Sequence, residues 1–457
     1  MCAPHADLFF CRWRENDLCG TLIRGKAETP MTFEELTIRL NHPLLSVRQN
    51  ALKELVEKEK AGELAPVECL GDVNNHIHTW YSFSPYSPTK AAWLAHRAGL
   101  ATAGIMDHDS IAGAAEFLAA GEILGLDVTS GLELRVSFAD TPFGDRRINN
   151  PDQSGIAYVA LHAVPECGRA VIEDYLKGVS LARARRNRKM VAKINELVAP
   201  LEVKMEYACD VLLYTSKKGA GGSVTERHLL YTLAGQLIDK FGKGEKLIDA
   251  LENQLGLKIS DKNREWLSDT ENPGYAYDVL GVLKGELVSK IYVDADTDEC
   301  PDVREVIALA KKAGAVCAYA YLGDVGSSVT GDKRPQSFED SYLDDLIPYL
   351  KDLGFNAVTY MPSRNTPEQL TRLKALCEAN DLFQISGEDI NSPRQSFVCL
   401  AARAPEFANL KTAAYALIGS EKAAKDDAGK SMFADAQIAS EPSLTARTEA
   451  FAALAHN

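Results

Sequence analysis

The sequence has no long hydrophobic run, because no window approaches the stretch of about 20 consecutive apolar residues that a membrane-spanning helix needs. The segment 1–17 places charges directly after a short apolar patch and lacks the layout of a secretory signal peptide. We therefore expect a soluble, cytoplasmic protein that does not act at a membrane.

Cysteine pairs at redox or zinc-binding spacing are also missing. The ten cysteines lie scattered along the chain, with no CxxC pair and no zinc-finger spacing. Such a distribution is typical of reduced thiols in a cytosolic protein, many of which are simply buried.

Positive charge is scarce: 50 Lys and Arg stand against 64 Asp and Glu, which gives a formal net charge of −14. An acidic total disfavours a nucleic-acid backbone as the main partner, although a local basic groove would not show in the total. Stretches that combine aromatic and basic residues for single-stranded nucleic acid are missing as well. We expect no nucleic-acid partner, and the sequence leaves the oligomeric state open.

What the sequence does contain is an ordinary globular composition, 46% hydrophobic and 25% charged, over 457 residues. This length exceeds that of one typical domain, so we expect a main domain with insertions or extensions. We expect a helical N-terminal extension at 1–70 and a discontinuous barrel at 71–166 and 300–404. A mostly helical cap at 167–299 is inserted in the barrel, and a helical C-terminal extension follows at 405–457.

Two capping-box spacings mark helix starts in the N-terminal extension, at Thr32 with Glu35 and at Ser46 with Gln49. The second opens a helical run that ends near Gly62. Within the cap, a Gly-rich break at 218–222 interrupts the helical pattern. The cap and a Gly-, Ser- and Asp-rich loop at 323–336 are expected to close over the substrate.

From about residue 72, short apolar runs rich in β-branched residues alternate with helical stretches. This alternation favours βαβ units and a mainly parallel sheet. One of the helices begins at Ser87–Pro88 and ends at Gly99, with proline in the first turn and glycine after the last. Strands are expected near 72–77, 102–106, 127–136, 156–164, 315–321, 355–361 and 382–386.

Residue types that commonly bind metal ions lie at the ends of these strands, namely His76 and His78 (first), His108 (second), Glu133 (third), His162 (fourth) and Asp389 (last). In a closed parallel barrel the carboxyl ends of all strands meet at one face, so these residues would converge there. Imidazole with carboxylate suits Zn²⁺, Mn²⁺ or Fe²⁺, and Glu133 could bridge two ions.

Each of these residues has another interpretation when it is taken alone. In a strand His76 and His78 point the same way, but an HxH pair also occurs by chance in core strands. His108 or His162 alone is as consistent with a buried structural histidine, and Asp389 could cap the following helix. The joint arrangement is what favours a metal site.

The ordered motifs HIHTWYSFSPYSP, MDHDS, GLEL, LHAVP and GEDINSP resemble those of the PHP family, named for polymerase and histidinol phosphatase. The resemblance spans roughly 72–166 and 300–400. It implies an α/β fold, a distorted seven-stranded (β/α)7 TIM-like barrel that binds up to three metal ions and hydrolyses a phosphoester.

The resemblance also implies the ligands of two metal sites. The first would be complete, with His76, His78, Glu133 and Asp389. The second would share Glu133 and add His162. A further histidine of the second site is missing, and the matching segment CAYAYLGD offers Tyr319 and Asp324 instead.

The third site implied by the resemblance keeps His108 but departs from the family pattern twice. Phe83–Ser84 stands where an acid or histidine is expected, and Asn391 replaces a final histidine. The carbonyl oxygen of Asn391 could still be a ligand, weaker than imidazole. We therefore expect one or two tightly held Mn, Zn or Fe ions rather than a full set of three.

Arginines are the expected phosphate ligands, because guanidinium pairs bidentately with phosphate oxygens. The segment TERHL is similar to an Arg-Pro-His segment in the caps of family members that hydrolyse nucleotides and small phosphates, and the basic segment LARARRNRK has a similar layout. The basic segment could equally be a solvated helix face. The expected substrate-binding residues are Arg183, Arg186, Arg227, His228, Arg364 and Arg394.

The expected reaction is hydrolysis of a small phosphorylated metabolite, of nucleotide or sugar phosphate type, by a metal-activated water. Asp389, His108 or His228 would carry the proton to the leaving alcohol. Two alternatives remain open. A degenerate barrel could be a non-catalytic small-molecule-binding or regulatory protein, as the missing ligands suggest. An amidohydrolase-like enzyme is disfavoured by the arginine-rich cap, because neutral amides need no such cluster.

Overall fold

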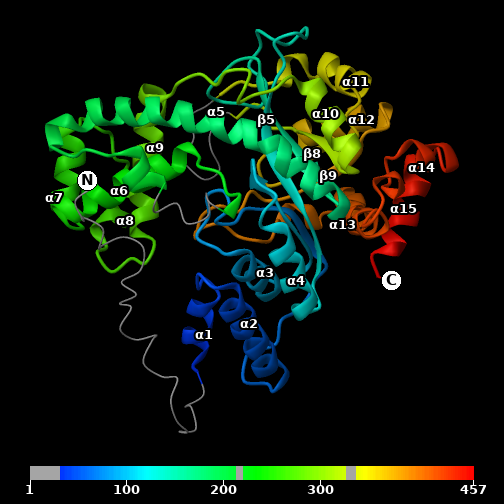
Figure 1. Ribbon diagram of the computed structural model, residues 1–457, viewed down its shortest axis with the longest axis horizontal. Helices are drawn as coiled ribbons and strands as arrows, with labels where there is room; N and C mark the ends of the chain where they lie inside the picture. The colour runs from blue at the N-terminus through cyan, green and yellow to red at the C-terminus, as the bar shows by residue number, and fades with distance from the viewer. Residues whose placement is uncertain (1–30, 213–219, 326–335, 457) are drawn as a thin grey trace. The chain divides into compact units, whose positions relative to one another are not determined.

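The computed structural model is a mixed α/β structure, and it describes residues 31–212, 220–325 and 336–456 (Figure 1). The segment 1–17 lies outside the described residues. The Gly-rich break at 218–222 and the loop at 323–336 lie partly outside them.

The chain forms two compact units. The first unit comprises the described residues of Met1–Arg39, Asn187–Ser216 and Glu226–Tyr292. The second unit comprises those of Leu40–Arg186, Lys217–Thr225 and Val293–Asn457. The extension, barrel and cap boundaries expected from the sequence stay a prediction.

The second unit contains all the strands of the described chain: β1 (Asp72–Ile77), β2 (Leu100–Ile105), β3 (Asp107–His108), β4 (Asp127–Thr129), β5 (Gly131–Ser137), β6 (Ile156–His162), β7 (Val316–Ala320), β8 (Ala357–Tyr360) and β9 (Phe383–Ser386). Each strand region expected from the sequence overlaps at least one of them, and the region 127–136 is divided between β4 and β5. A three-stranded sheet has the order β1-β2-β4, and a six-stranded sheet has the order β3-β5-β6-β7-β8-β9.

Strand pairing is parallel except at β6, which runs antiparallel to both β5 and β7. The expectation that every strand ends at one face is therefore wrong for β6. The reason lies in the connection 138–155, which is fully described and contains turns and bends but no helix. A parallel return needs a crossover, whereas an antiparallel return needs only a loop.

Strand β1 makes backbone hydrogen bonds beyond its own sheet. Ile77 forms a parallel bridge with Ile390, which follows β9, and accepts a hydrogen bond from Met106 N at 2.9 Å. Met106 lies between β2 and β3. Strand β1 is thus bonded both to the segment after β9 and to the link between the two sheets.

The helices of the second unit are α2 (Leu45–Lys60), α3 (Pro88–Arg97), α4 (Ala114–Leu124), α10 (Val303–Ala313), α11 (Leu343–Leu353), α12 (Pro367–Ala379), α13 (Ala408–Ala423), α14 (Asp435–Ser440) and α15 (Leu444–Leu454). Those of the first unit are α1 (Phe33–Arg39), α6 (Glu226–Phe241), α7 (Glu245–Asp249), α8 (Asp261–Ser268) and α9 (Tyr275–Ile291). The long helix α5 (Glu166–Val198) passes from the second unit to the first after Arg186. The described residues of 167–299 are mostly helical.

Short helical segments complete the described chain. The 3₁₀ segments are Ala199–Leu201, Asp340–Tyr342, Leu400–Arg403, Pro405–Phe407 and Ala428–Lys430, and the π-helical segments are Tyr207–Leu212 and Ala250–Gln254. No helix within the described part of the chain combines the length and the apolar composition that crossing a bilayer requires.

The predicted helix starts are partly confirmed. Thr32 and Glu35 form a reciprocal capping box, with Thr32 N donating to Glu35 Oε2 at 2.8 Å and Glu35 N to Thr32 Oγ1 at 3.2 Å. Ser87 caps α3 through its side chain. The box at Ser46 is wrong, because α2 already begins at Leu45 and its cap residue makes no side-chain bond.

Side-chain alternation along β5 separates the core from the site. Leu132, Leu134 and Val136 belong to a large apolar cluster with residues of α10, α11 and α12, helices that lie together beside β8 and β9 (Figure 1). Successive side chains of a strand point to opposite faces. Glu133 and Arg135 therefore point to the face that these helices do not cover.

Candidate metal centre

The two histidines of the HxH pair come from the end of β1. Ile77 between them is fully buried, and alternation turns His76 and His78 to the same side. His78 N donates to Ile390 O at 2.9 Å, and Ile390 N to His76 O at 3.1 Å. At Gly387 a Cβ atom would lie 2.6 Å from the Cβ of His76, so the close approach of this segment to β1 requires glycine.

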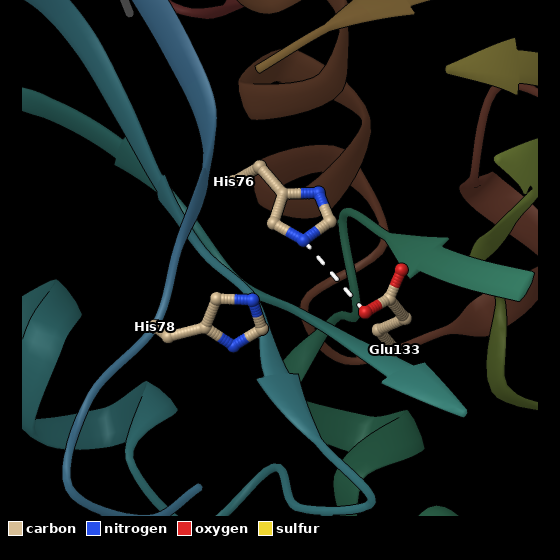
Figure 2. A group of neighbouring side chains, drawn as sticks. All are labelled: His76, His78 and Glu133. Carbon is tan, nitrogen blue, oxygen red and sulfur yellow. Dashed lines mark ion pairs between the residues drawn. The ribbon is translucent and has the colours of Figure 1, made fainter. Parts of the chain in front are cut away.

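His76, His78 and Glu133 form a group whose ligand atoms all lie within 4.8 Å of one another. Figure 2 shows the two imidazoles and the carboxylate pointing toward one another, with a dashed line between His76 and Glu133. All three residues are buried. Two imidazoles with a carboxylate are a donor set that Zn²⁺, Mn²⁺ and Fe²⁺ accept, so these residues fit a bound metal ion.

Glu133 lies between histidines from two different strands. Its Oε2 atom is 3.8 Å from His76 Nε2 and 3.1 Å from Nδ1 of His108, which pairs with Glu133 in the register of β3 and β5. The ring centroids of His78 and His108 are 4.6 Å apart. The carboxylate therefore lies between His76 and His108, and its role as a ligand that bridges two ions stays a prediction.

Asp389 contacts this group from the segment after β9. Its Oδ1 atom lies 3.0 Å from His78 Nε2, and its side chain is 39% exposed. The buried Asn391 donates its side-chain amide to the same Oδ1 atom, and its backbone N–H donates to Gln395. Asn391 thus orients Asp389, and its role as a direct ligand stays a prediction.

Asp107 supports the site, and the sequence analysis missed it. It accepts hydrogen bonds from Thr79 N at 2.6 Å, Thr79 Oγ1 at 2.6 Å and Ser82 Oγ at 2.7 Å. Ser82 Oγ in turn lies 3.3 Å from His78 Nδ1. Orienting partners of this kind are typical of metal-binding histidines. The signal in the sequence was a second acid in MDHDS together with hydroxyl residues just after the HxH pair.

The pKa values of two of these three imidazoles, those of His76 and His108, suit metal binding. Burial lowers the pKa of His76, and burial with the charge of His78 lowers the pKa of His108 to about 3. Burial alone would also lower the pKa of His78, but the hydrogen bond and charge of Asp389 raise it. His76 and His108 are therefore neutral near pH 7 and have the lone pairs that a metal ion needs.

The sequence predicted that His162 lies level with Glu133, at the carboxyl ends of the strands. The structure places His162 elsewhere along β5. Because β6 is antiparallel, His162 pairs with Gly131, two residues before Glu133 on β5. Burial and the charge of His76 lower its pKa to about 3, and within the described chain its Nε2 atom has no hydrogen-bond partner. His162 does not belong to the three-residue group, and its role as a ligand stays a prediction.

The opposite end of β6 brings a residue to the site that the sequence analysis missed. Tyr158 pairs with Arg135 and so shares the face of Glu133. Its ring centroid lies 5.9 Å from that of His108. A tyrosine near the start of a strand matches no motif, and only the reversed direction of β6 places it here.

The proposed replacements for missing ligands lie elsewhere. Tyr319 pairs with Val159, next to the partner of Glu133, so it points to the opposite face and joins the apolar core. Its hydroxyl donates to Glu339 at 3.1 Å. Phe83 is a buried apolar side chain. Tyr319 therefore does not substitute for the missing histidine.

Asp324 is also engaged outside the histidine group. Its carboxylate accepts a hydrogen bond from Phe338 N, and its own N–H donates to Asp340 at 3.0 Å. These bonds join the two described flanks of the loop at 323–336.

The basic segment LARARRNRK lies in α5, and part of it is not a solvated helix face. Arg183 and Arg186 are buried, and their Nε atoms donate to the two carboxylate oxygens of Glu299 at 3.0 and 2.7 Å. Arg135 from β5 pairs with the same carboxylate. Burial would raise the pKa of Glu299, but the three guanidinium groups lower it. Sequence analysis missed both Arg135 and Glu299.

The other predicted phosphate ligands are dispersed. Arg364 follows β8 and donates from Nε to Leu322 O at 3.1 Å, and Arg394 is exposed in a turn after β9. Arg227 and His228 belong to the first unit, in the first turn of α6, and both are half-buried. Their role in substrate binding stays a prediction.

No protein-family model matches the sequence, and the search of curated proteins finds no relative. Among solved structures, the chain is similar to a candidate metal-dependent phosphoesterase from Bifidobacterium adolescentis, with 21% identity, coverage of 74% of this chain and 96% of that one, and a TM-score of 0.46. It is also similar to an amidohydrolase from Chromobacterium violaceum with bound sulfate and no metal, with 16% identity, 72% and 90% coverage and a TM-score of 0.47. At these identities and TM-scores we base the functional argument on the site geometry alone, and membership of the PHP family remains a proposal.

Proposed function

We propose that the chain is a metal-dependent hydrolase that removes phosphate from a small phosphorylated molecule, of nucleotide or sugar phosphate type. The observation that carries this proposal is the buried group of His76, His78 and Glu133, with ligand atoms within 4.8 Å of one another. His108 and Asp389 border the group from two further segments. Five potential ligands from four segments in one place favour a site built for metal ions.

The proposed architecture is a distorted seven-stranded barrel of the PHP type. Its support is the bonding of β1, which joins the segment after β9 through Ile77 and Ile390 and joins the start of the other sheet through Met106. β2 and β3 can be counted as one interrupted strand, and so can β4 and β5. The two sheets then form one ring of seven strands, which the bonds between β1 and the segment after β9 close. Barrels of this kind build their sites at the carboxyl ends of the strands.

A bound divalent ion would supply Lewis acidity, polarising a phosphoryl oxygen and lowering the pKa of water. The residues of this chain would hold and orient that ion: neutral His76 and His108 would offer lone pairs, and Glu133 would offer a carboxylate between them. Asp389 or His108 would move the proton to the leaving alcohol. Arg364 and Arg394, which follow β8 and β9, would neutralise phosphate charge.

A non-catalytic small-molecule-binding protein is the second candidate function. It is favoured by the apolar side chain of Phe83, by the placement of Tyr319 in the core and by the engagement of the Asn391 amide with Asp389. Each of these removes a ligand that a fully equipped trinuclear hydrolase would use.

Elemental analysis of the purified protein, paired with hydrolysis of an aryl phosphate and of an aryl amide with and without Mn²⁺, tests the proposal. We expect one or two metal equivalents and Mn²⁺-dependent phosphatase activity. The variant His76→Ala should lose the metal and the activity but keep its secondary structure. Amide cleavage without phosphatase activity would reassign the reaction. Metal-free, inactive protein would favour the binding function.

A further inference from the structure

We infer that Arg183 is a positioning residue of the metal centre, because its guanidinium holds the Asp109 carboxylate and so fixes His108 against Glu133. This inference rests on the proposed function and deepens it. It assigns a role to a buried arginine that would otherwise be counted only among the phosphate ligands.

The turn after β3 is the part of the site that needs such support. Asp109 has a φ of 45°, in the left-handed region that residues other than glycine rarely adopt. Its N–H donates to Glu133 O at 2.8 Å. The strained residue is therefore bonded to the backbone of the residue that carries the metal-binding carboxylate. It also directly follows His108, whose Nδ1 lies 3.1 Å from Glu133 Oε2.

Arg183 reaches this turn from α5. Its Nη1 atom lies 2.7 Å from Asp109 Oδ2, and both side chains are almost fully buried. A buried carboxylate that loses its cation becomes strongly unfavourable. The ion pair therefore gives the strained turn one preferred arrangement, with the side chain of Asp109 directed at Arg183.

Arg183 is itself held in place by residues that lead back to the same strand. Its Nε atom donates to Glu299 Oε1 at 3.0 Å, and Glu299 also pairs with Arg135, two residues beyond Glu133 on β5. The contacts thus form a closed circuit through β5, namely Glu133, Arg135, Glu299, Arg183, Asp109 and His108. A circuit of buried contacts fixes His108 relative to Glu133 more firmly than the backbone of the turn would alone.

Titration of the protein with Mn²⁺ alone, with free Mn²⁺ followed by electron paramagnetic resonance, tests the inference. In Arg183→Gln and in Asp109→Asn we expect at least one Mn²⁺ equivalent to bind about 10- to 100-fold more weakly, the effect typical of residues that orient metal ligands. Asparagine tolerates the left-handed conformation, so Asp109→Asn removes the charge with little change in backbone preference. The double variant should bind Mn²⁺ no more weakly than either single variant, because both substitutions break the same ion pair.

Two further variants separate positioning from a general loss of stability. Arg185→Gln is the matched control: Arg185 lies on the same helix and pairs with Asp298 at 2.6 Å, but its side chain is 53% exposed. We expect wild-type Mn²⁺ affinity in this control. Arg183→Lys keeps the charge opposite Asp109 and should restore most of the affinity that Arg183→Gln loses.

The outcomes distinguish this inference from the proposed function. A wild-type protein that binds no Mn²⁺, Zn²⁺ or Fe²⁺ rejects the metal centre and the inference with it. A wild-type protein that binds Mn²⁺, together with wild-type affinity in Arg183→Gln and Asp109→Asn, rejects the inference and leaves the metal centre standing. If Arg183→Gln does not fold, Asp109→Asn and Arg183→Lys decide, and unchanged affinity in the former overturns the inference.

Discussion

Two charged clusters lie in the second unit, and they balance their charges in different ways. The histidine cluster consists of His76, His78, His108, Glu133 and Asp389. The Glu299 cluster consists of Glu299, Arg135, Arg183 and Arg186. In the Glu299 cluster three permanent cations surround one carboxylate. In the histidine cluster two carboxylates face imidazoles, and burial disfavours the charged form of His76 and His108.

The difference shows which cluster depends on something from outside. A buried carboxylate requires a compensating cation or hydrogen bonds. Glu299 receives both from guanidinium groups of the chain itself. Glu133 lies beside the imidazoles of His76 and His108, whose pKa values are lowered, so a cation bound between them would add positive charge next to this carboxylate. We therefore expect loss of the Glu299 carboxylate to lower the free energy of unfolding, and added metal to raise it by binding to the histidine cluster.

The largest expected effect comes from breaking the Glu299 cluster. Glu299→Ala leaves three buried guanidinium groups without their shared carboxylate, and we expect the free energy of unfolding to fall by about 3–5 kcal/mol. Urea denaturation followed by circular dichroism measures this loss. Asp298→Ala in the same segment is the control and should change stability by less than about 1 kcal/mol, because that side chain is 71% exposed. Equal effects of the two substitutions would contradict the comparison.

Sequence analysis could not have found the Glu299 cluster. Glu299 stands in the acidic stretch DADTDECPD, which resembles a solvated loop, and LARARRNRK resembles a solvated helix face. The partners are 164 residues apart for Arg135 and 113 for Arg186. Local periodicity carries no information about pairs at that separation, so the ion pairs become visible only when α5 and β5 are placed together.

The histidine cluster was easier to predict, because its members lie where strands end. Alternation within β1 places His76 and His78 on one side, and the parallel pairing of β3 with β5 brings His108 beside Glu133. The sequence did not show that His162 pairs with Gly131, since the direction of β6 depends on the absence of a helix in 138–155. Residue patterns within a strand do not encode its direction. The same reversal placed Tyr158 near His108.

A third buried carboxylate, Glu339, sharpens the comparison, because its hydrogen bonds come from neutral donors. It accepts from Leu322 N at 2.8 Å and from the Tyr319 hydroxyl at 3.1 Å. Burial raises its pKa from 4.5 to about 7, although these hydrogen bonds act in the opposite direction. No guanidinium group of the described residues pairs with Glu339 as three do with Glu299, and this acid holds its proton well above its ordinary range.

The raised pKa of Glu339 predicts a loss of stability as pH rises. The folded state binds the proton more tightly than the unfolded state, so the contribution is full below pH 4.5 and is lost as pH rises through about 7. Between pH 5 and pH 8 the loss is about 2.5 kcal/mol at 1.36 kcal/mol per pKa unit. The side chain of Glu339→Gln cannot ionise. In urea denaturation, the free energy of unfolding of this variant relative to wild type should therefore rise by this amount between pH 5 and pH 8. An unchanged difference would mean that Glu339 is ionised throughout.

The smallest expected effect is the stabilisation of the histidine cluster by metal. A ligand that binds only the folded state stabilises it by RT ln(1 + [L]/Kd), which is about 1.4 kcal/mol at free Mn²⁺ ten times Kd. We expect this increase in the unfolding free energy of wild type and of Glu339→Gln, and none in His76→Ala, which lacks a ligand of the group. Thermal or urea denaturation with and without Mn²⁺ measures it. Equal stabilisation of His76→Ala by Mn²⁺ would mean that the ion binds elsewhere. The proposed difference between the Glu299 cluster, which the chain's own arginines neutralise, and the histidine cluster, which takes up an added cation, would then be wrong.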